Sequence, residues 1–140
     1  MINIFKKNKD KKILDNQKYI SIGALLIHAA KIDENYTEKE KEIIKKTLEQ
    51  ISGNKDKKNN LISEAEKLES NSNQILDFTK TVKNIEKSLK IKIIETIWRI
   101  IYSDKNADIY ETNLMRRLTG LLYLDSKTVG DIKIKILKEN

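Results

Sequence analysis

The sequence predicts an all-α domain of about seven helices, and three observations lead to that prediction. The chain of 140 residues has no proline and only four glycines, so it lacks the turn residues that a fold of many β-hairpins requires. Apolar residues recur at spacings of three and four along most of the chain, as on one face of a helix. Hydrophobic residues make up 39% of the sequence, which is enough for one folded core at this length.

The first two helices follow a basic segment. Residues 1–17 carry mainly charged and amide side chains, so we expect a basic flexible leader before a helical domain that covers residues 18–140. The apolar spacing predicts a helix over Tyr19–Ile32 and a second over Thr37–Ile51. Gly53 follows the second pattern directly and marks the end of that helix.

The middle of the chain predicts two modest helices and one central helix. The segments 61–68 and 75–85 each carry one apolar stripe. Residues 88–103 are apolar on nearly all sides, so this helix is expected at the centre, with Trp98 in the core. Its β-branched residues would also suit a strand, but its polar residues form one narrow stripe only on a helix: Lys92, Glu95, Thr96 and Arg99.

Two further helices are expected at the C-terminal end. One covers Asp108–Leu122, with Tyr123 expected in the core, and the pair Asp125-Ser126 begins the last. Residues 131–137 alternate apolar and polar side chains as a half-buried strand does. A lone strand would leave its backbone hydrogen bonds unmade, and no comparable second strand is evident, so we predict a helix.

Composition excludes several functional classes. The chain has no cysteine and a single histidine, which excludes disulfides, thiolate zinc sites, cysteine nucleophiles and paired-histidine metal sites. That residue, His28, lies between apolar neighbours, so we expect a partly buried neutral imidazole. No pattern assembles a nucleophile, a base and an oxyanion site, so the sequence predicts a protein that is not an enzyme.

Charge and hydropathy bear on partners and compartment. The net charge is +7, but the positive excess is concentrated in residues 1–20, and arginine, which favours base and phosphate contacts, is rare. Nucleic-acid binding is therefore the weaker alternative. Ile20–Ala30 is too short to span a bilayer, which takes about 20 apolar residues, and it fits a signal peptide poorly. We expect a cytoplasmic protein with no transmembrane segment.

A helix–loop–helix unit occurs twice. Residues 33–40 and 104–111 share the pattern D-x-N-x-[T/D]-x-x-E, and oxygen ligands of this kind suit Ca²⁺ or another divalent cation. An EF-hand is excluded, because Ile109 and Met115 stand where that loop needs glycine and glutamate. Calcium takes six to eight oxygens, more than one loop offers. The candidate metal ligands are Asp33, Asn35, Glu40, Asp104, Asn106, Asp108 and Glu111.

The same acidic residues have a structural interpretation. Thr37-x-x-Glu40 and Asp108-x-x-Glu111 are both capping-box patterns, which stabilise the start of a helix. Asp33 and Asp104 would then close Asx turns. Capping and weak metal binding are compatible, so both interpretations stay open.

Three stretches resemble a known family: AAKIDENYTEKE (Ala29–Glu40), ILDFTKTV (Ile75–Val82) and the long stretch Ile97–Leu124. Over about residues 18–138 the sequence resembles the TerB-like family of all-helical domains, in which two helix pairs are each joined by an acidic loop. Where the family loop has Asp-Gly, this chain has Asp33-Glu34 and Asp104-Lys105.

The resemblance implies a tellurite or stress-response context, and with no catalytic pattern in the sequence we predict a non-enzymatic binding module. It also implies divalent-metal binding by the loop acids and protein partners, including a membrane-associated assembly at the cytoplasmic face. Two alternatives remain. One is a protein-interaction adaptor whose loop acids are purely structural, and the other is a basic nucleic-acid-binding helical protein.

Overall fold

The computed structural model describes residues 2–33, 36–53, 60–72, 76–103 and 109–139, with side chains from Asn16 onward except at positions 33, 76, 77, 79 and 109–112. Over these residues the chain forms seven α-helices and no strand, which confirms the all-α prediction. The helices are α1 (Ile2–Ala30), α2 (Glu38–Ser52), α3 (Leu61–Ser70), α4 (Leu76–Val82), α5 (Lys87–Tyr102), α6 (Ile109–Leu121) and α7 (Ser126–Lys138), and a 3-10 helix, η1 (Lys31–Asp33), follows α1.

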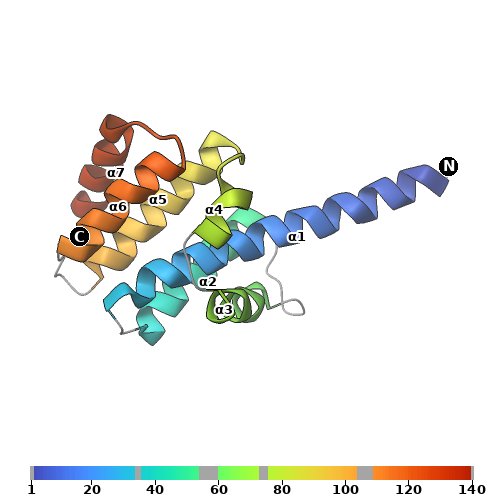
Figure 1. Ribbon diagram of the computed structural model, residues 1–140, viewed down its shortest axis with the longest axis horizontal. Helices are drawn as coiled ribbons and strands as arrows, with labels where there is room; N and C mark the ends of the chain where they lie inside the picture. The colour runs from blue at the N-terminus through green and yellow to red at the C-terminus, as the bar shows by residue number, and fades with distance from the viewer. Residues whose placement is uncertain (1, 34–35, 54–59, 73–75, 104–108, 140) are drawn as a thin grey trace.

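Helix α1 organises the fold. Its C-terminal half packs against α2, α3, α4 and α5, while α7 packs on α5 (Figure 1). The core is built from the apolar stripes of these helices, and α5 supplies many of its large side chains, as expected of a central helix. A buried hydrogen bond of 2.9 Å joins the hydroxyls of Thr47 and Thr96 and satisfies two polar groups between α2 and α5.

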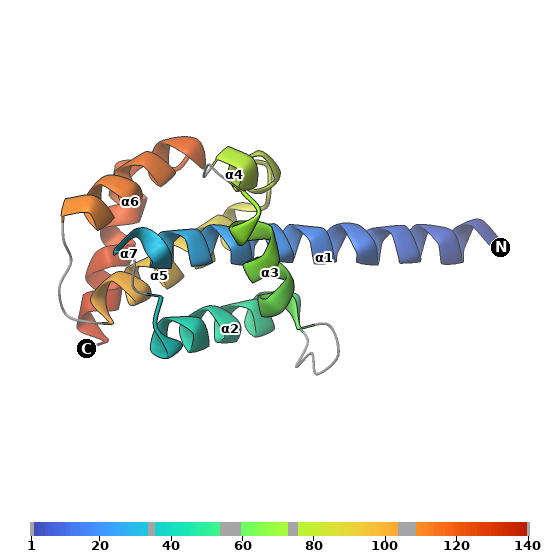
Figure 2. The ribbon, with the colours of Figure 1, turned by 60° about the horizontal axis from the view of Figure 1, so that its bottom comes forward.

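The start of α1 differs from the sequence-based boundary. The backbone is helical from Ile2, well before Tyr19, and the N-terminal half of the helix extends beyond the rest of the protein (Figure 2). No glycine or proline precedes Gly23, so nothing in the sequence stops the helix from continuing toward the N-terminus. The flexibility expected of residues 1–17 remains a prediction.

The ambiguous segment 131–137 lies in α7, so the helix prediction there is confirmed. Ile132 and Ile136 are buried, whereas Ile134 is 53% exposed. Ile132 and Ile136, which are four residues apart, face the core, and Ile134 between them does not, as on a helix. The carboxylate of Asp125 accepts a 2.6 Å hydrogen bond from the Thr128 amide and caps this helix, as predicted.

The prediction for Tyr123 was wrong, whereas that for Trp98 is confirmed. Trp98 is buried, and its indole N–H donates to the carbonyl of Val129 at 3.2 Å. Tyr123 is 73% exposed, because it ends α6 in the left-handed conformation with φ 56°. The amides of Tyr123 and Leu124 donate to the carbonyls of Gly120 and Thr119. This Schellman arrangement points the tyrosine side chain away from the core.

Candidate functional site

The first acidic loop leads into a complete capping box. The amide of Glu40 donates to Thr37 Oγ1 at 3.1 Å, and the amide of Thr37 donates to Glu40 Oε1 at 2.8 Å. Glu40 is only 6% exposed. The capping interpretation is therefore confirmed for this loop, and one carboxylate oxygen of Glu40 is engaged in holding the start of α2.

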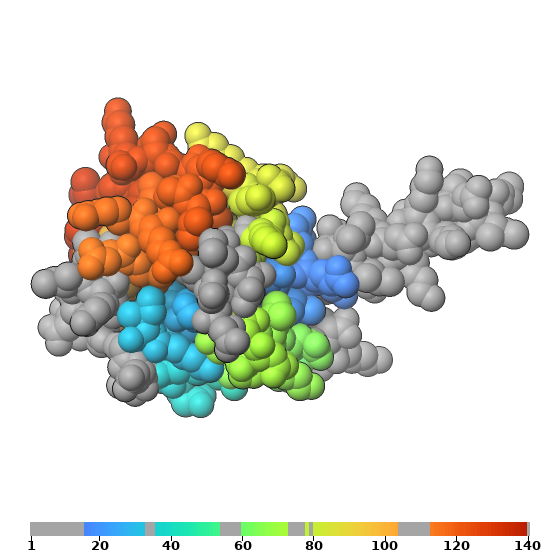
Figure 3. Space-filling view, in the orientation of Figure 1, coloured from blue at the N-terminus to red at the C-terminus, as the bar shows by residue number. Residues whose placement is uncertain are grey.

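The fold brings the flanks of the two acidic loops together. Lys39, inside the first repeat, donates from Nζ to the carbonyl of Ser103 at 2.8 Å, and Ser103 directly precedes Asp104 of the second repeat. The 3-10 helix η1, which leads into the first loop, contacts α6, which follows the second (Figure 3). Two segments far apart in the sequence thus meet at one end of the helix bundle.

Most of the predicted ligands lie outside the described residues. Asp33 ends η1 and Glu111 belongs to the first turn of α6, but only their backbones are described. Among the residues whose side chains are described, no three histidine or acidic groups converge as a metal site would require. The residues that lie wholly outside the described chain are Asn35, Asp104, Asn106 and Asp108.

A buried carboxylate lies next to the first loop. Glu69 of α3 is 8% exposed, and its Oε2 accepts a 2.7 Å hydrogen bond from Lys31. His28 places Nδ1 at 3.6 Å from the other oxygen of Glu69, and its ring lies 5.9 Å from that of Phe78. His28 is partly buried, as expected. Glu69 is not among the residues that the sequence predicts for the site, because no spacing rule links α3 to the end of α1.

Tyr36 joins this charged group from the loop side. Its side chain is half-buried, and its hydroxyl oxygen is buried without a hydrogen-bond partner among the described residues. Burial raises the pKa of Tyr36 well above its ordinary value, and the nearby carboxylates, led by Glu66, raise the pKa further. The ammonium of Lys31 lies 6.0 Å from the Tyr36 ring. Carboxylates and lysines therefore alternate around the first loop, since Glu69 pairs with Lys31 and Glu66 pairs with Lys41.

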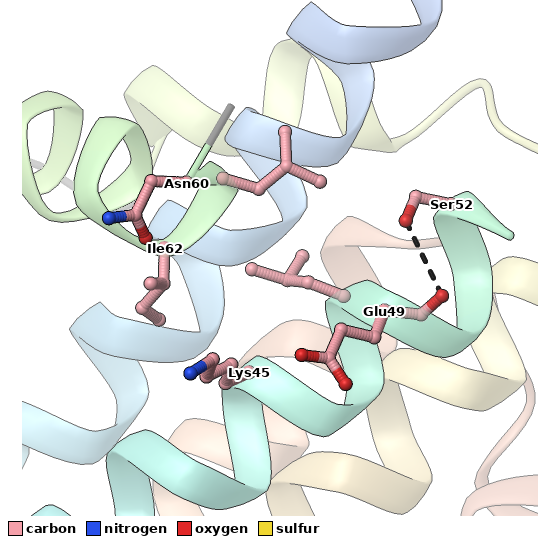
Figure 4. Close-up of a pocket in the computed structure, with 7 residues that line it drawn as sticks. Lys45, Glu49, Ser52, Asn60 and Ile62 are labelled. Carbon is pink, nitrogen blue, oxygen red and sulfur yellow. Dashed lines mark hydrogen bonds between the residues drawn. The ribbon is translucent and has the colours of Figure 1, made fainter. Parts of the chain in front are cut away.

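One small cavity lies between α2 and the start of α3, where Lys45, Glu49 and Ser52 face Asn60 and Ile62 (Figure 4). Its volume is about 30 Å³, which suits a water molecule rather than a substrate. The hydroxyl of Ser52 donates to the carbonyl of Glu49 at 3.4 Å across one edge. The cavity is therefore too small to be a candidate binding site for a substrate.

The described helices include none with the length and hydropathy needed to cross a membrane. The fold and the paired loops define a class of protein, an all-helical domain with two helix–acidic loop–helix units. The chain belongs to the family of tellurite resistance protein TerB, whose sequence profile matches residues 19–134. No curated protein and no solved structure matches the chain.

Proposed function

We propose that this protein is a non-enzymatic binding module whose two acidic loops together bind a divalent cation. The observation that supports the proposal is the hydrogen bond from Lys39 to Ser103, because it holds the flanks of both loops side by side. Oxygens from two loops can then combine in one site.

The chemistry of the donor set favours calcium. Carboxylate and amide oxygens suit Ca²⁺ and Mg²⁺ rather than softer metals, and Ca²⁺ takes six to eight of them. Glu40 has one oxygen engaged in the capping box, so we assign the main contribution to the other candidate residues. These are Asp33 and Asn35 of the first loop with Asp104, Asn106, Asp108 and Glu111 of the second.

We also propose a biological setting for this module. We place the module in the cytoplasm in a tellurite or stress response, where cation binding would alter how it contacts protein partners, including a membrane-associated assembly. The family membership supports this setting, and the cation would act through the loop conformation rather than through a reaction.

The first test is a calorimetric titration of chelator-treated protein with Ca²⁺, with Mg²⁺ and Zn²⁺ as comparisons. We expect saturable Ca²⁺ binding in the wild type that is lost in the double variant Asp33→Asn plus Asp104→Asn. The variant Glu64→Gln plus Asp131→Asn is the control, because it removes the same charge at exposed positions on α3 and α7. Binding that is absent in the wild type, or lost equally in the control, would refute the metal proposal.

An adaptor with purely structural loop acids is the second candidate. It is supported by Ile134 and Leu137, which lie three residues apart on α7 and are 53% and 44% exposed. Exposed apolar residues grouped on one surface are typical of protein contacts. For this function, Ile134→Lys would abolish partner capture while the double asparagine variant would capture normally.

A further inference from the structure

A second candidate site includes none of the predicted loop ligands. A groove of about 230 Å³ runs between α6 and α7. Trp98 and Met115 form its base, since both line the groove and are 5% and 2% exposed. The volume is below the roughly 300–1,000 Å³ of drug-sized sites, so the groove suits a smaller molecule.

The groove exists because of how α7 packs. This helix lies mainly against α5 and contacts α6 only lightly, which leaves the space between α6 and α7 unfilled. Gly130 faces the groove, and a Cβ added there would meet no atom within 4 Å. A larger residue at this position would occupy the space, so the glycine keeps the groove open.

The rim of the groove is positively charged. Arg116 contributes from α6 and Lys133 from α7, and the described lining residues include no carboxylate. The ammonium of Lys133 lies 5.4 Å from the centre of the Trp98 ring, so a cation–π contact holds this charge above the apolar base. The nearby carboxylate of Asp125 accepts the Thr128 amide in the helix cap.

We propose that this groove binds a small amphipathic carboxylate, with the apolar part against Trp98 and Met115 and the carboxylate between Arg116 and Lys133. Arginine binds carboxylates through parallel hydrogen bonds, and the apolar base excludes water from the tail. The complementary charge makes a carboxylate a better occupant than a neutral or cationic molecule.

Trp98 is the only tryptophan, so its fluorescence reports on the groove directly. We would titrate the protein with sodium octanoate below its micelle concentration, and with octanol as a neutral analogue, and confirm the affinity by calorimetry. We expect a saturable change with octanoate and weaker binding of octanol. An unsaturable change, or none by either method, would overturn the proposal.

Two glycine variants test the location. Gly130→Leu fills the groove and should abolish octanoate binding. Gly120→Leu is the matched control, because Gly120 is also helical and has no atom within 4 Å of an added Cβ, but it does not line the groove. Circular dichroism checks that both variants fold. Equal affinity in the two variants would place any binding elsewhere and overturn the proposal.

The charge assignment has its own test. The double variant Arg116→Gln plus Lys133→Gln should weaken octanoate binding about tenfold, which corresponds to about 1.4 kcal/mol, and leave octanol binding unchanged. Because Lys133 touches Trp98, the midpoint of the titration is compared rather than the emission. If the double variant binds octanoate as well as the wild type, the two cations do not recognise the carboxylate.

Discussion

The ammonium of Lys31 lies 2.7 Å from the carboxylate of Glu69, although the two residues come from opposite sides of the first acidic loop. The side chain of Glu69 is 9% exposed, whereas that of Lys31 is 40% exposed. A carboxylate this deeply buried needs a charged partner to offset its loss of water. The pair therefore fixes η1, which directly follows α1, against α3, next to the point where the first loop begins.

Replacing Lys31 by methionine should destabilise the protein. The change keeps most of the side-chain volume but leaves the buried carboxylate of Glu69 without its ammonium. We expect the free energy of unfolding to fall by about 1–2 kcal/mol, measured by urea denaturation.

The matched control is Lys41→Met. Lys41 pairs with Glu66 at 3.4 Å, but both side chains are about one-third exposed, at 35% and 31%. Such surface pairs contribute little, so we expect a change of less than about 0.5 kcal/mol. If both methionine variants lost equal stability, the burial of Glu69 would not explain the effect.

Tyr36→Phe should stabilise the protein. The hydroxyl oxygen of Tyr36 is buried without a partner among the described residues, which is costly relative to a hydroxyl in water. Removing it should raise the free energy of unfolding by about 1 kcal/mol. A loss of stability would contradict this prediction.

Tyr36→Phe should also reduce the loss of stability at alkaline pH. The folded pKa of Tyr36 lies above its ordinary value of 10.0, mainly because burial disfavours the phenolate. Below pH 10.0 the ionisation of Tyr36 does not affect stability, because the tyrosine is neutral in both the folded and the unfolded chain. As the pH rises from there toward the folded pKa, the free energy of unfolding falls, because the unfolded chain ionises first. Denaturation of wild type and variant on both sides of that pH measures the difference.

The sequence predicted those features that depend on local spacing. Periodicity located α2 and α5, and the Thr37-x-x-Glu40 pattern predicted a capping box that the structure confirms. Contacts between segments that are far apart in the sequence correspond to no pattern of residue spacing. The pairing of Lys31 with Glu69 and the contact of Lys39 with Ser103 depend on how the helices cross. The adjacency of the residues that flank the two loops was therefore evident only from the fold.

Gly23 shows the same dependence on tertiary packing, and Gly23→Ala should destabilise the protein. A Cβ at this position would lie 2.7 Å from the Cβ of Ala65, so α1 and α3 would have to separate. We expect a loss of about 2 kcal/mol, measured by thermal and urea unfolding. Gly120→Ala provides the contrast, because an added methyl meets nothing within 4 Å and better helix propensity should stabilise by about 0.5 kcal/mol. Equal effects would show that helix propensity alone matters.

Tyr123→Gly should stabilise the end of α6. Tyr123 adopts φ 56°, a left-handed conformation that costs a residue with a side chain about 1 kcal/mol. The change also removes a cation–π contact, in which the ammonium of Lys90 lies 5.7 Å from the centre of the Tyr123 ring. Such a contact is weak at an exposed site. We therefore expect a net gain of about 0.5 kcal/mol in urea denaturation. Gly53→Ala is the inverse control, because Gly53 ends α2 at φ 68° and should lose about 1 kcal/mol. A destabilised Tyr123→Gly variant would mean that the ring contact with Lys90 outweighs the backbone strain.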